Sequence, residues 1–251
     1  MEKSFDIKET SLLPVRWRVL SGSWLKVMAM AAMLIDHTAG QILGHYEAFR
    51  EPLFVVGRHA VNCYFLLRCV GRLAFPLFCF LLVEGFLHTH DRRKYGRNLM
   101  VFALLSEVPW NLTHGGHLYG ASQSVMWTLL LGYLALVAVE RWERDLVATG
   151  RMALCVFSII GAGILLRADY GSCGVSFVLL LYLLRRNHVM RAAVGCCFLG
   201  SRWIAGLAFI PIAMYNGRRG FIRGAFGKYL FYAFYPLQLL ALYVTKRWLG
   251  I

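Results

Sequence analysis

Ionisable side chains stand in segments of the sequence that are otherwise apolar. The stretch from Trp24 to Ile35 carries one charge, Lys26, and Asp36 and His37 follow it directly. An imidazole with its ordinary pKa of about 6.5 can act as a general base, a proton relay or an acyl carrier. A charged residue at the centre of a membrane helix costs roughly 2.5–3.5 kcal/mol, so such groups usually face a bundle interior or a wet cavity. The stretch therefore predicts a polar site inside a membrane.

The spacing of these groups indicates which of them can act together. Lys26 and His37 are eleven residues apart, close to three helical turns, which places them on one face about 16 Å apart. With Lys26 at the cytoplasmic boundary, His37 then lies near the bilayer midplane. Asp36 points about 100° away from His37, so we do not expect the two to form a dyad on one helix. Arg72 on a neighbouring helix is the expected partner of Asp36.

Further ionisable groups occur in the later apolar segments. Any one of them could equally hold helices together or take part in chemistry, but their number in the first three spans favours a site. They are Arg72, Glu84, His88 and Glu107, with Asp169 at a tight turn further along. The pairs His88/His90 and His114/His117 have spacings seen in metal sites, but neither has a third ligand nearby, so no metal is expected.

The composition indicates the class of protein. Of the 251 residues, 59% are hydrophobic and only 16% are charged, and the mean hydropathy is +0.56. This apolar excess runs along the whole chain, which is typical of a polytopic membrane protein with one domain. The net charge of +14 comes in short clusters between apolar runs, as in cytoplasmic loops of membrane proteins. A nucleic-acid binder would instead gather basic residues beside stacking aromatics, so no nucleic-acid partner is expected.

The expected fold is an all-α membrane bundle. A crossing needs about 20 apolar residues, and about eight or nine segments approach this length, several of them short enough to be broken or partly inserted. The candidate spans are 25–44, 71–88, 97–112, 124–140, 152–168, 172–184, 190–200, 203–215 and 228–247. Segment 53–70 is apolar but carries arginines, which favours an interfacial or re-entrant amphipathic helix. Residues 25–251 would then form one transmembrane domain.

The loops predict the orientation. Segments 91–97, 185–191 and 216–224 are rich in Arg and Lys, whereas 111–124 has no Lys, Arg, Asp or Glu. The positive-inside rule puts the three basic loops in the cytoplasm and 111–124 outside. Residues 1–24 are then a cytoplasmic amphipathic segment, and the C-terminus lies outside.

Six motifs follow one another over about residues 24–245. They are LKVMAMAAMLIDHTAG, GRLAFPLFCFLLVEGFLHT, SEVPWNL, DYGSCGV, YNGRRG and FYAFYPLQLL. Their order and spacing resemble those of the TraX family, named for a conjugative protein that acetylates the N-terminus of pilin in the bacterial inner membrane. The family is distantly similar to membrane acyltransferases, many of which carry an arginine, ten intervening residues and a histidine in an early span. Here Lys26 stands in the place of that arginine and His37 in that of the histidine.

The resemblance implies a set of site residues. His37 and Asp36 are the implied catalytic residues, with acetyl-CoA as the acyl donor and no metal. The implied substrate- and cofactor-binding residues are Lys26, Arg72, Glu84, His88, Glu107, Asp169, Tyr215, Asn216, Arg218, Arg219, Tyr235 and Gln238. Gln238 is a departure, because the family pattern FYP-x-H has a histidine at this place. The cations expected to meet the phosphates of coenzyme A are Lys26, Arg92, Arg93, Lys94, Arg218 and Arg219.

The function implied is that of an integral inner-membrane O- or N-acetyltransferase. It would move an acetyl group from cytosolic acetyl-CoA to an acceptor at the outer face: a pilin-like N-terminal amine, a glycan or a small molecule. One alternative is a proton-coupled transporter that relays protons through His37 and the intramembrane carboxylates. A transporter often shows inverted repeats, and the sequence has no clear internal repeat. The other alternative is a membrane assembly or scaffold protein whose polar residues only pack helices.

Overall fold

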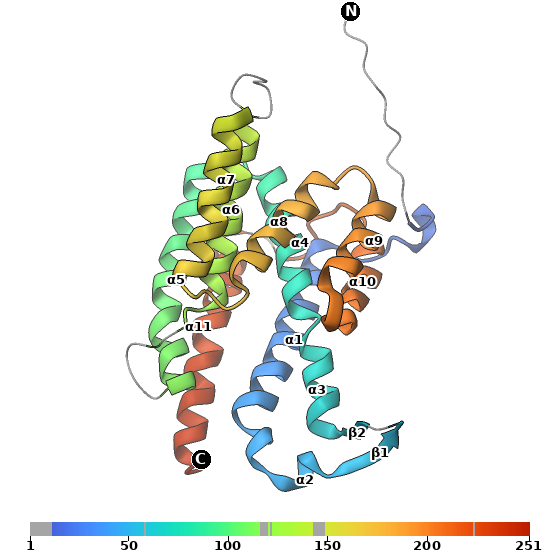
Figure 1. The fold of residues 1–251 in the computed structure, drawn as a ribbon, viewed down its shortest axis with the longest axis vertical. Coiled ribbons are helices and arrows are strands. Elements are labelled where there is room, and N and C mark those ends of the chain that lie inside the picture. Colours follow the sequence, from blue (N-terminus) through green and yellow to red (C-terminus); the bar gives the residue numbers. More distant parts are fainter. Residues whose placement is uncertain (1–11, 58, 116–119, 121, 143–148, 223) are drawn as a thin grey trace, which may run out of the picture.

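The computed structural model describes residues 12–57, 59–115, 120, 122–142, 149–222 and 224–251. These residues are almost entirely helical and form a bundle whose long helices run roughly parallel and antiparallel to its long axis (Figure 1). This confirms the all-α bundle expected from the apolar composition. Residues 1–11 of the predicted cytoplasmic segment lie outside the described residues.

The helices follow the apolar segments of the sequence. The longer ones are α1 (Gly22–Gln41), α4 (Ala74–His88), α5 (Arg92–Gly115), α6 (Val125–Trp142), α7 (Thr149–Leu165), α8 (Gly171–Leu183), α9 (His188–Leu199) and α11 (Gly224–Trp248). The shorter ones are η1 (Val15–Trp17), η2 (Leu43–His45), α2 (Glu47–Arg50), α3 (Cys63–Gly71), η4 (Gly200–Ala208) and α10 (Phe209–Ala213).

Among the described residues, three helical stretches are long and apolar enough to cross a membrane by length and composition: Gly22–His45, Cys63–His88 and Val125–Trp142. The helices α7, α8 and α9 are apolar but have only 17, 13 and 12 residues. At a rise of 1.5 Å per residue each is shorter than the roughly 30 Å of hydrocarbon. Short helices in this part of the chain agree with the sequence prediction that several apolar segments fall below the length of a full crossing.

The segment 53–70 differs from its prediction. Instead of one amphipathic helix it contains the antiparallel hairpin of β1 (Pro52–Val56) and β2 (His59–Asn62), followed by α3. Gly57 lies between the strands with a φ of 63°, a conformation that favours glycine. The side chain of Asn62 then accepts a hydrogen bond from the Phe65 amide at 2.8 Å and starts α3. The turn glycine and the helix cap thus divide a segment whose apolar composition alone suggested a single helix.

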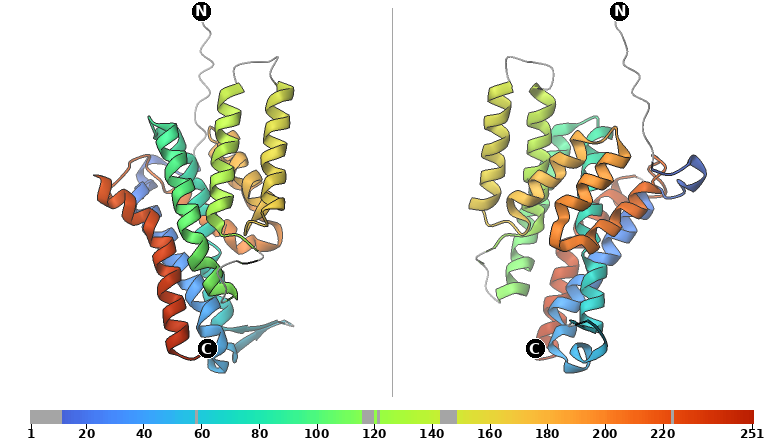
Figure 2. Two further views of the ribbon diagram at one scale, coloured as in Figure 1. Left: turned by 90° about the vertical axis from the view of Figure 1, so that its left-hand side faces the viewer. Right: turned by 45° about the vertical axis from the view of Figure 1, so that its right-hand side comes forward.

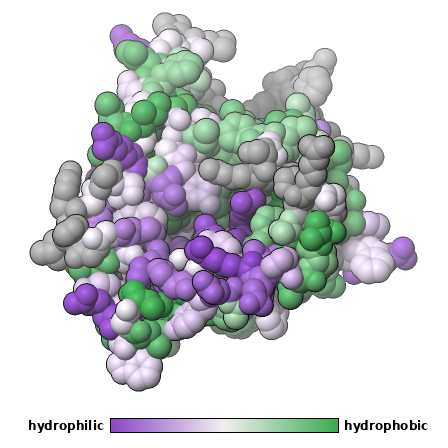
Figure 3. Space-filling model, turned by 60° about the horizontal axis from the view of Figure 1, so that its bottom comes forward, coloured by the Kyte–Doolittle hydropathy of each residue, from purple (hydrophilic) through white to green (hydrophobic). Residues whose placement is uncertain are grey.

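Both ends of the bundle carry hydrophilic side chains. The turns that join α4 to α5 and α8 to α9, and the loop from Met214 to Ile222, lie at the end where α1 begins (Figures 1 and 2). These are the basic loops that the positive-inside rule predicts to lie on one side of the membrane. The opposite end holds α2 and the hairpin, and hydrophilic side chains gather across it as well (Figure 3).

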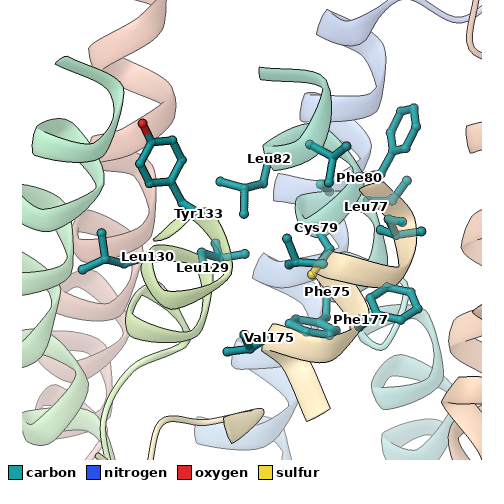
Figure 4. Packing of buried hydrophobic residues seen from close by; sticks show 14 of the residues in the cluster. Phe75, Leu77, Cys79, Phe80, Leu82, Leu129, Leu130, Tyr133, Val175 and Phe177 are labelled. Atoms are coloured by element: carbon teal, nitrogen blue, oxygen red, sulfur yellow. The ribbon is translucent and has the colours of Figure 1, made fainter. Parts of the chain in front are cut away.

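The hydrophobic core lies between α4, α6 and α8. Figure 4 shows side chains of this core from all three helices, and the rings of Phe75 on α4 and Phe177 on α8 lie with their centroids 6.0 Å apart. Phe80, Leu77 and Phe177 are each 1% exposed. This packed centre fixes α4 and α6, which form two walls of the site described next.

Candidate functional site

A cavity of about 460 Å³ opens between α1, α4, α5, α6, α11 and the loop after α10. Its lining runs from Thr89, Gly217 and Arg219, near the basic end, to Met33 and Tyr235 deeper in the bundle. Of the candidate site residues, the lining contains Lys26, Glu84, His88, Tyr215, Arg219 and Tyr235. The remaining surface is mostly apolar and aromatic, which is typical of a small-molecule site.

Cationic side chains lie along the cavity from its basic end. Lys26 is half-buried, and its Nζ atom lies 5.0 Å from the centroid of the Phe231 ring. Arg219 is exposed, and both it and Lys94 lie within electrostatic reach of Lys228. Lys228 also lines the cavity, although it was not among the predicted residues. Its position at the start of the last predicted span, beside the basic loop 216–224, is the sequence signal that could have indicated it.

One wall of the cavity joins a carboxylate, an imidazole and a phenol. The His88 Nδ1 atom is 2.9 Å from the Glu84 carbonyl oxygen and 3.7 Å from its Oε2 atom. The Tyr215 hydroxyl forms a hydrogen bond with the Glu84 side chain. Burial, and then the negative charge of Glu84, raise the pKa of Tyr215. Tyr215 therefore stays a neutral hydrogen-bond donor at physiological pH.

The YNGRRG motif forms a loop that is bonded to the start of α1. The Gly22 amide donates to the Arg218 carbonyl at 2.8 Å, and the Ser23 hydroxyl donates to the Arg219 carbonyl at 2.9 Å. Gly217 and Gly220 have φ angles of 74° and 85°, which favour glycine. At Gly220 an added Cβ would also overlap the side chain of Ser21. The loop thereby holds Arg219 at the cavity.

Two residues of this motif have structural contacts outside the cavity. The Asn216 side chain accepts a hydrogen bond from the Arg218 amide at 2.9 Å, and the Asn216 amide donates to Leu20. Neither Asn216 nor Arg218 is among the lining residues. Arg92 is also held elsewhere, because its guanidinium binds both carboxylate oxygens of Glu140 at 2.9 and 3.2 Å. The prediction that Arg92 is available for a phosphate is therefore not supported by its contacts.

His37 lies one helical turn beyond the deep end of the cavity. Its Nδ1 atom is 3.0 Å from Nε2 of Gln238, and its ring centroid is 6.1 Å from that of Tyr235. Met33, one turn earlier on α1, lines the cavity as Tyr235 does, whereas His37 is not part of the lining. Lys26 and His37 both contact α11, through Phe231 and Gln238 respectively, which confirms their shared face.

Asp36 points to a different helix from His37. Its Oδ2 atom is 2.8 Å from Nη1 of Arg68 on α3, and that guanidinium also donates to the Asp36 carbonyl at 3.3 Å. The absence of an Asp36–His37 dyad agrees with the prediction. The prediction that Arg72 is the partner is wrong: Arg72 acts on Asp36 only electrostatically. α3 was not expected to pack along α1, and this packing brings Arg68 to the carboxylate.

Several polar side chains lie around Tyr235. Glu107 Oε1 accepts hydrogen bonds from the Ser124 amide at 3.1 Å and from the Trp127 indole at 2.8 Å. Glu107 and Asp169 both lie within electrostatic reach of the Tyr235 hydroxyl. Tyr235 therefore stands between the cavity, His37 and these two carboxylates.

Two buried side-chain oxygens have no hydrogen-bond partner among the described residues: Gln238 Oε1 and Glu107 Oε2. The Tyr235 hydroxyl, by contrast, is hydrogen-bonded to the Val125 backbone and the Ser124 side chain. Tyr235 and Gln238 are only 4% and 6% exposed. A buried polar group left without a partner costs about 1–3 kcal/mol, so such groups mark places where a ligand or water completes the bonding. No group of three His, Cys, Asp or Glu side chains in the described residues could hold a metal ion.

Comparison with known proteins identifies the family. The family model "TraX protein" matches residues 21–246. A protein of Dichelobacter nodosus named "Probable fimbrial assembly protein FimC, serogroup H1" is 30% identical over 255 residues, which cover 90% of this chain and 95% of that protein. No solved structure matches the chain. With nearly its whole length matched by the family model, the chain belongs to the TraX family.

Proposed function

We propose that the protein is a membrane acetyltransferase that binds acetyl-CoA in the cavity. The observation that carries this proposal is the position of His37, one turn beyond a cavity that is lined by cations from its basic end inward. The phosphates of coenzyme A would lie near Arg219, Lys228 and Lys26. The pantetheine arm would follow the apolar wall towards Met33. The basic end would then face the cytoplasm, in agreement with the positive-inside rule.

The reaction needs a base for the acceptor and a donor for the developing oxyanion. His37 takes the proton from the acceptor, whose oxygen or nitrogen attacks the thioester carbonyl. The C–S bond then breaks, and the thiolate of coenzyme A takes the proton back from His37. The buried Tyr235 hydroxyl, on a residue that lines the deep end of the cavity, would donate to the carbonyl oxygen. Met33 is flexible enough to move aside and admit the acetyl group to His37.

Gln238 sets the tautomer of His37 in this mechanism. The oxygen and nitrogen of a side-chain amide exchange places by a half-turn. With Oε1 facing His37, the amide accepts from Nδ1–H and leaves Nε2 with the lone pair that a base requires. Gln238 thus does for His37 what a carboxylate or carbonyl does for many catalytic histidines.

The proposed reaction depends on His37 as the base. We expect His37→Ala to lower acetyl transfer by at least about a hundredfold, because a positioned base contributes roughly 10²–10⁴. The measurement is incorporation of label from radioactive acetyl-CoA in membranes that hold equal amounts of inserted protein. His45→Ala is the matched control, since His45 lies in η2 and outside the cavity. Full activity of the His37 variant would refute the proposal.

A proton-coupled transporter is the second candidate function. It is favoured by the run of buried polar groups from Glu107 through Tyr235 to His37 and Gln238. Thermal stabilisation of the purified protein by acetyl-CoA separates the two. Specific stabilisation supports the acetyltransferase, and its absence supports the transporter or an assembly role.

A further inference from the structure

A second group of polar residues lies on the side of His37 away from the cavity. Gln41 is one turn after His37 on α1, and its Nε2 atom is 3.2 Å from Nε2 of His114 at the end of α5. Arg68 reaches the same part of α1, where its Nη1 atom would lie 3.1 Å from a Cβ at Gly40. Lys246 acts electrostatically on His114. We call the four residues Gln41, Arg68, His114 and Lys246 the distal cluster. It belongs to the end of the molecule where hydrophilic side chains gather (Figure 3).

His114 is exposed yet held in one orientation. Its ring stacks on Trp110 with centroids 3.7 Å apart, and its Nδ1 atom is 3.0 Å from the Trp110 carbonyl. A carbonyl only accepts, so Nδ1 carries the hydrogen and Nε2 presents its lone pair towards Gln41. The distal cluster thus has a fixed imidazole at an accessible position.

The charges of the distal cluster favour one class of ligand. Arg68 is paired with Asp36, but Lys246 forms no ion pair within the described part of the chain. Arg68 also acts electrostatically on His37. The positive charge on this side of His37 repels an approaching ammonium group. The same charge attracts a carboxylate or a phosphate.

Gln238 supplies an independent sign of a ligand beside His37. Whichever of its amide atoms faces the imidazole, the other is left without a partner in the described structure, and the side chain is 94% buried. An acceptor hydroxyl can donate to the amide oxygen or accept from the amide nitrogen. A hydroxyl therefore satisfies the amide in either orientation.

We propose that the distal cluster binds the acceptor, and that the acceptor is an anionic molecule that offers a hydroxyl group. This inference rests on the proposed acetyltransferase function. The acceptor O–H bond breaks, its proton passes to His37, and its oxygen forms an ester with the acetyl carbon. The C–S bond breaks and the thiolate receives the proton, so coenzyme A and an O-acetylated anion leave on opposite sides of His37.

The test uses the full chain in lipid nanodiscs, where both faces are accessible. Release of coenzyme A from acetyl-CoA is measured with four matched probes: glucose, glucuronate, glucose 1-phosphate and glucosamine. We expect kcat/KM for one or both anions to exceed that for glucose about tenfold, with glucosamine the poorest. The better anion tells whether the site takes a carboxylate or a phosphate.

A charge reversal ties the preference to this cluster. Lys246→Glu should raise KM for the anionic probe about tenfold and leave KM for acetyl-CoA in place, because Lys246 is not among the residues that line the cavity. Arg247→Glu, the neighbouring exposed residue on α11, is the control and should behave as wild type. Preference for glucose or glucosamine, no transfer to any probe by protein that binds acetyl-CoA, or an unchanged KM in Lys246→Glu would each overturn the inference. Lack of acetyl-CoA binding would overturn the proposed function first.

Discussion

At the scale of single residues, His37 of α1 contacts Gln238 of α11, and the proposed reaction depends on this pair. Family members are expected to carry a histidine where this chain has Gln238. An amide cannot take up a proton in the physiological range, so Gln238 orients His37 without sharing its proton. This chain thus pairs His37 with an amide where the family pattern would pair it with a second imidazole.

Replacement of Gln238 tests its role as a positioning residue. We expect Gln238→Leu to lower kcat for acetyl transfer about ten- to a hundredfold, because the Nδ1 hydrogen bond that fixes the tautomer is lost. KM for acetyl-CoA should stay constant, since Gln238 does not line the cavity. Gln238→His restores a partner and should recover most of kcat. A leucine variant with unchanged kcat would show that the amide only packs helices.

The spacing of residues in the sequence predicts which side chains share one face of a helix, but not which side chains of two helices meet. Lys26 and His37 share a face because both belong to one uninterrupted helix, so helical periodicity alone predicts their relation. Arg68 could not be chosen over Arg72 as the partner of Asp36, because that choice depends on how α3 packs along α1. Contacts between helices are set by tertiary packing, which a single sequence does not show.

At the scale of elements, close contact between α1 and α3 depends on Gly71. A Cβ at this position would overlap the side chain of Asp36, which the ion pair with Arg68 holds in place. The glycine therefore permits the approach that brings Arg68 beside the carboxylate.

We expect Gly71→Ala to destabilise the protein by about 1–3 kcal/mol, the usual cost of overpacking a close contact. The measurement is thermal unfolding in detergent. Gly161→Ala on α7 is the matched control, because nothing lies within 4 Å of its added Cβ, and it should be neutral or stabilise by up to about 1 kcal/mol. Equal melting temperatures for the two variants would contradict this account of the α1–α3 contact.

The elements themselves were predicted well where the apolar runs are long. α1, α4 and α6 follow directly from such runs. The hairpin at 52–62 was missed because β-branched and aromatic residues in a short apolar run are compatible with either structure, and Gly57 and Asn62 decide between them.

At the scale of the whole molecule, cationic side chains line the cavity, and His37, the base of the proposed reaction, lies beyond its deep end. Arg219, Lys228 and Lys26 follow the cavity from its basic end to its middle, and Met33 and Tyr235 close it. These positive charges would attract a polyanionic donor to this end of the cavity. The sequence predicted the basic loops of this end, but not that Lys228 joins Arg219 on one cavity, since this needs α11 placed beside α1.

This arrangement predicts a specific electrostatic effect on donor binding. We expect Lys228→Glu to raise KM for acetyl-CoA about tenfold, and the difference from wild type to shrink as salt screens the charge. KM is measured at about 0.05 and 0.5 M ionic strength. Arg151→Glu on α7, an exposed residue outside the cavity lining, is the control for a general surface effect. An equal change in both variants would argue against phosphate binding at Lys228.

Lys26, Met33, His37 and Gln41 all belong to the single rigid rod α1. The separation between the anchoring cation and the reacting imidazole is therefore set by helical pitch and not by any loop. In the proposed acetyltransferase, a thioester on a shorter arm, such as acetyl-N-acetylcysteamine, would not span the distance from Lys26 to His37. Selectivity for the length of the carrier would then follow from the geometry of one helix.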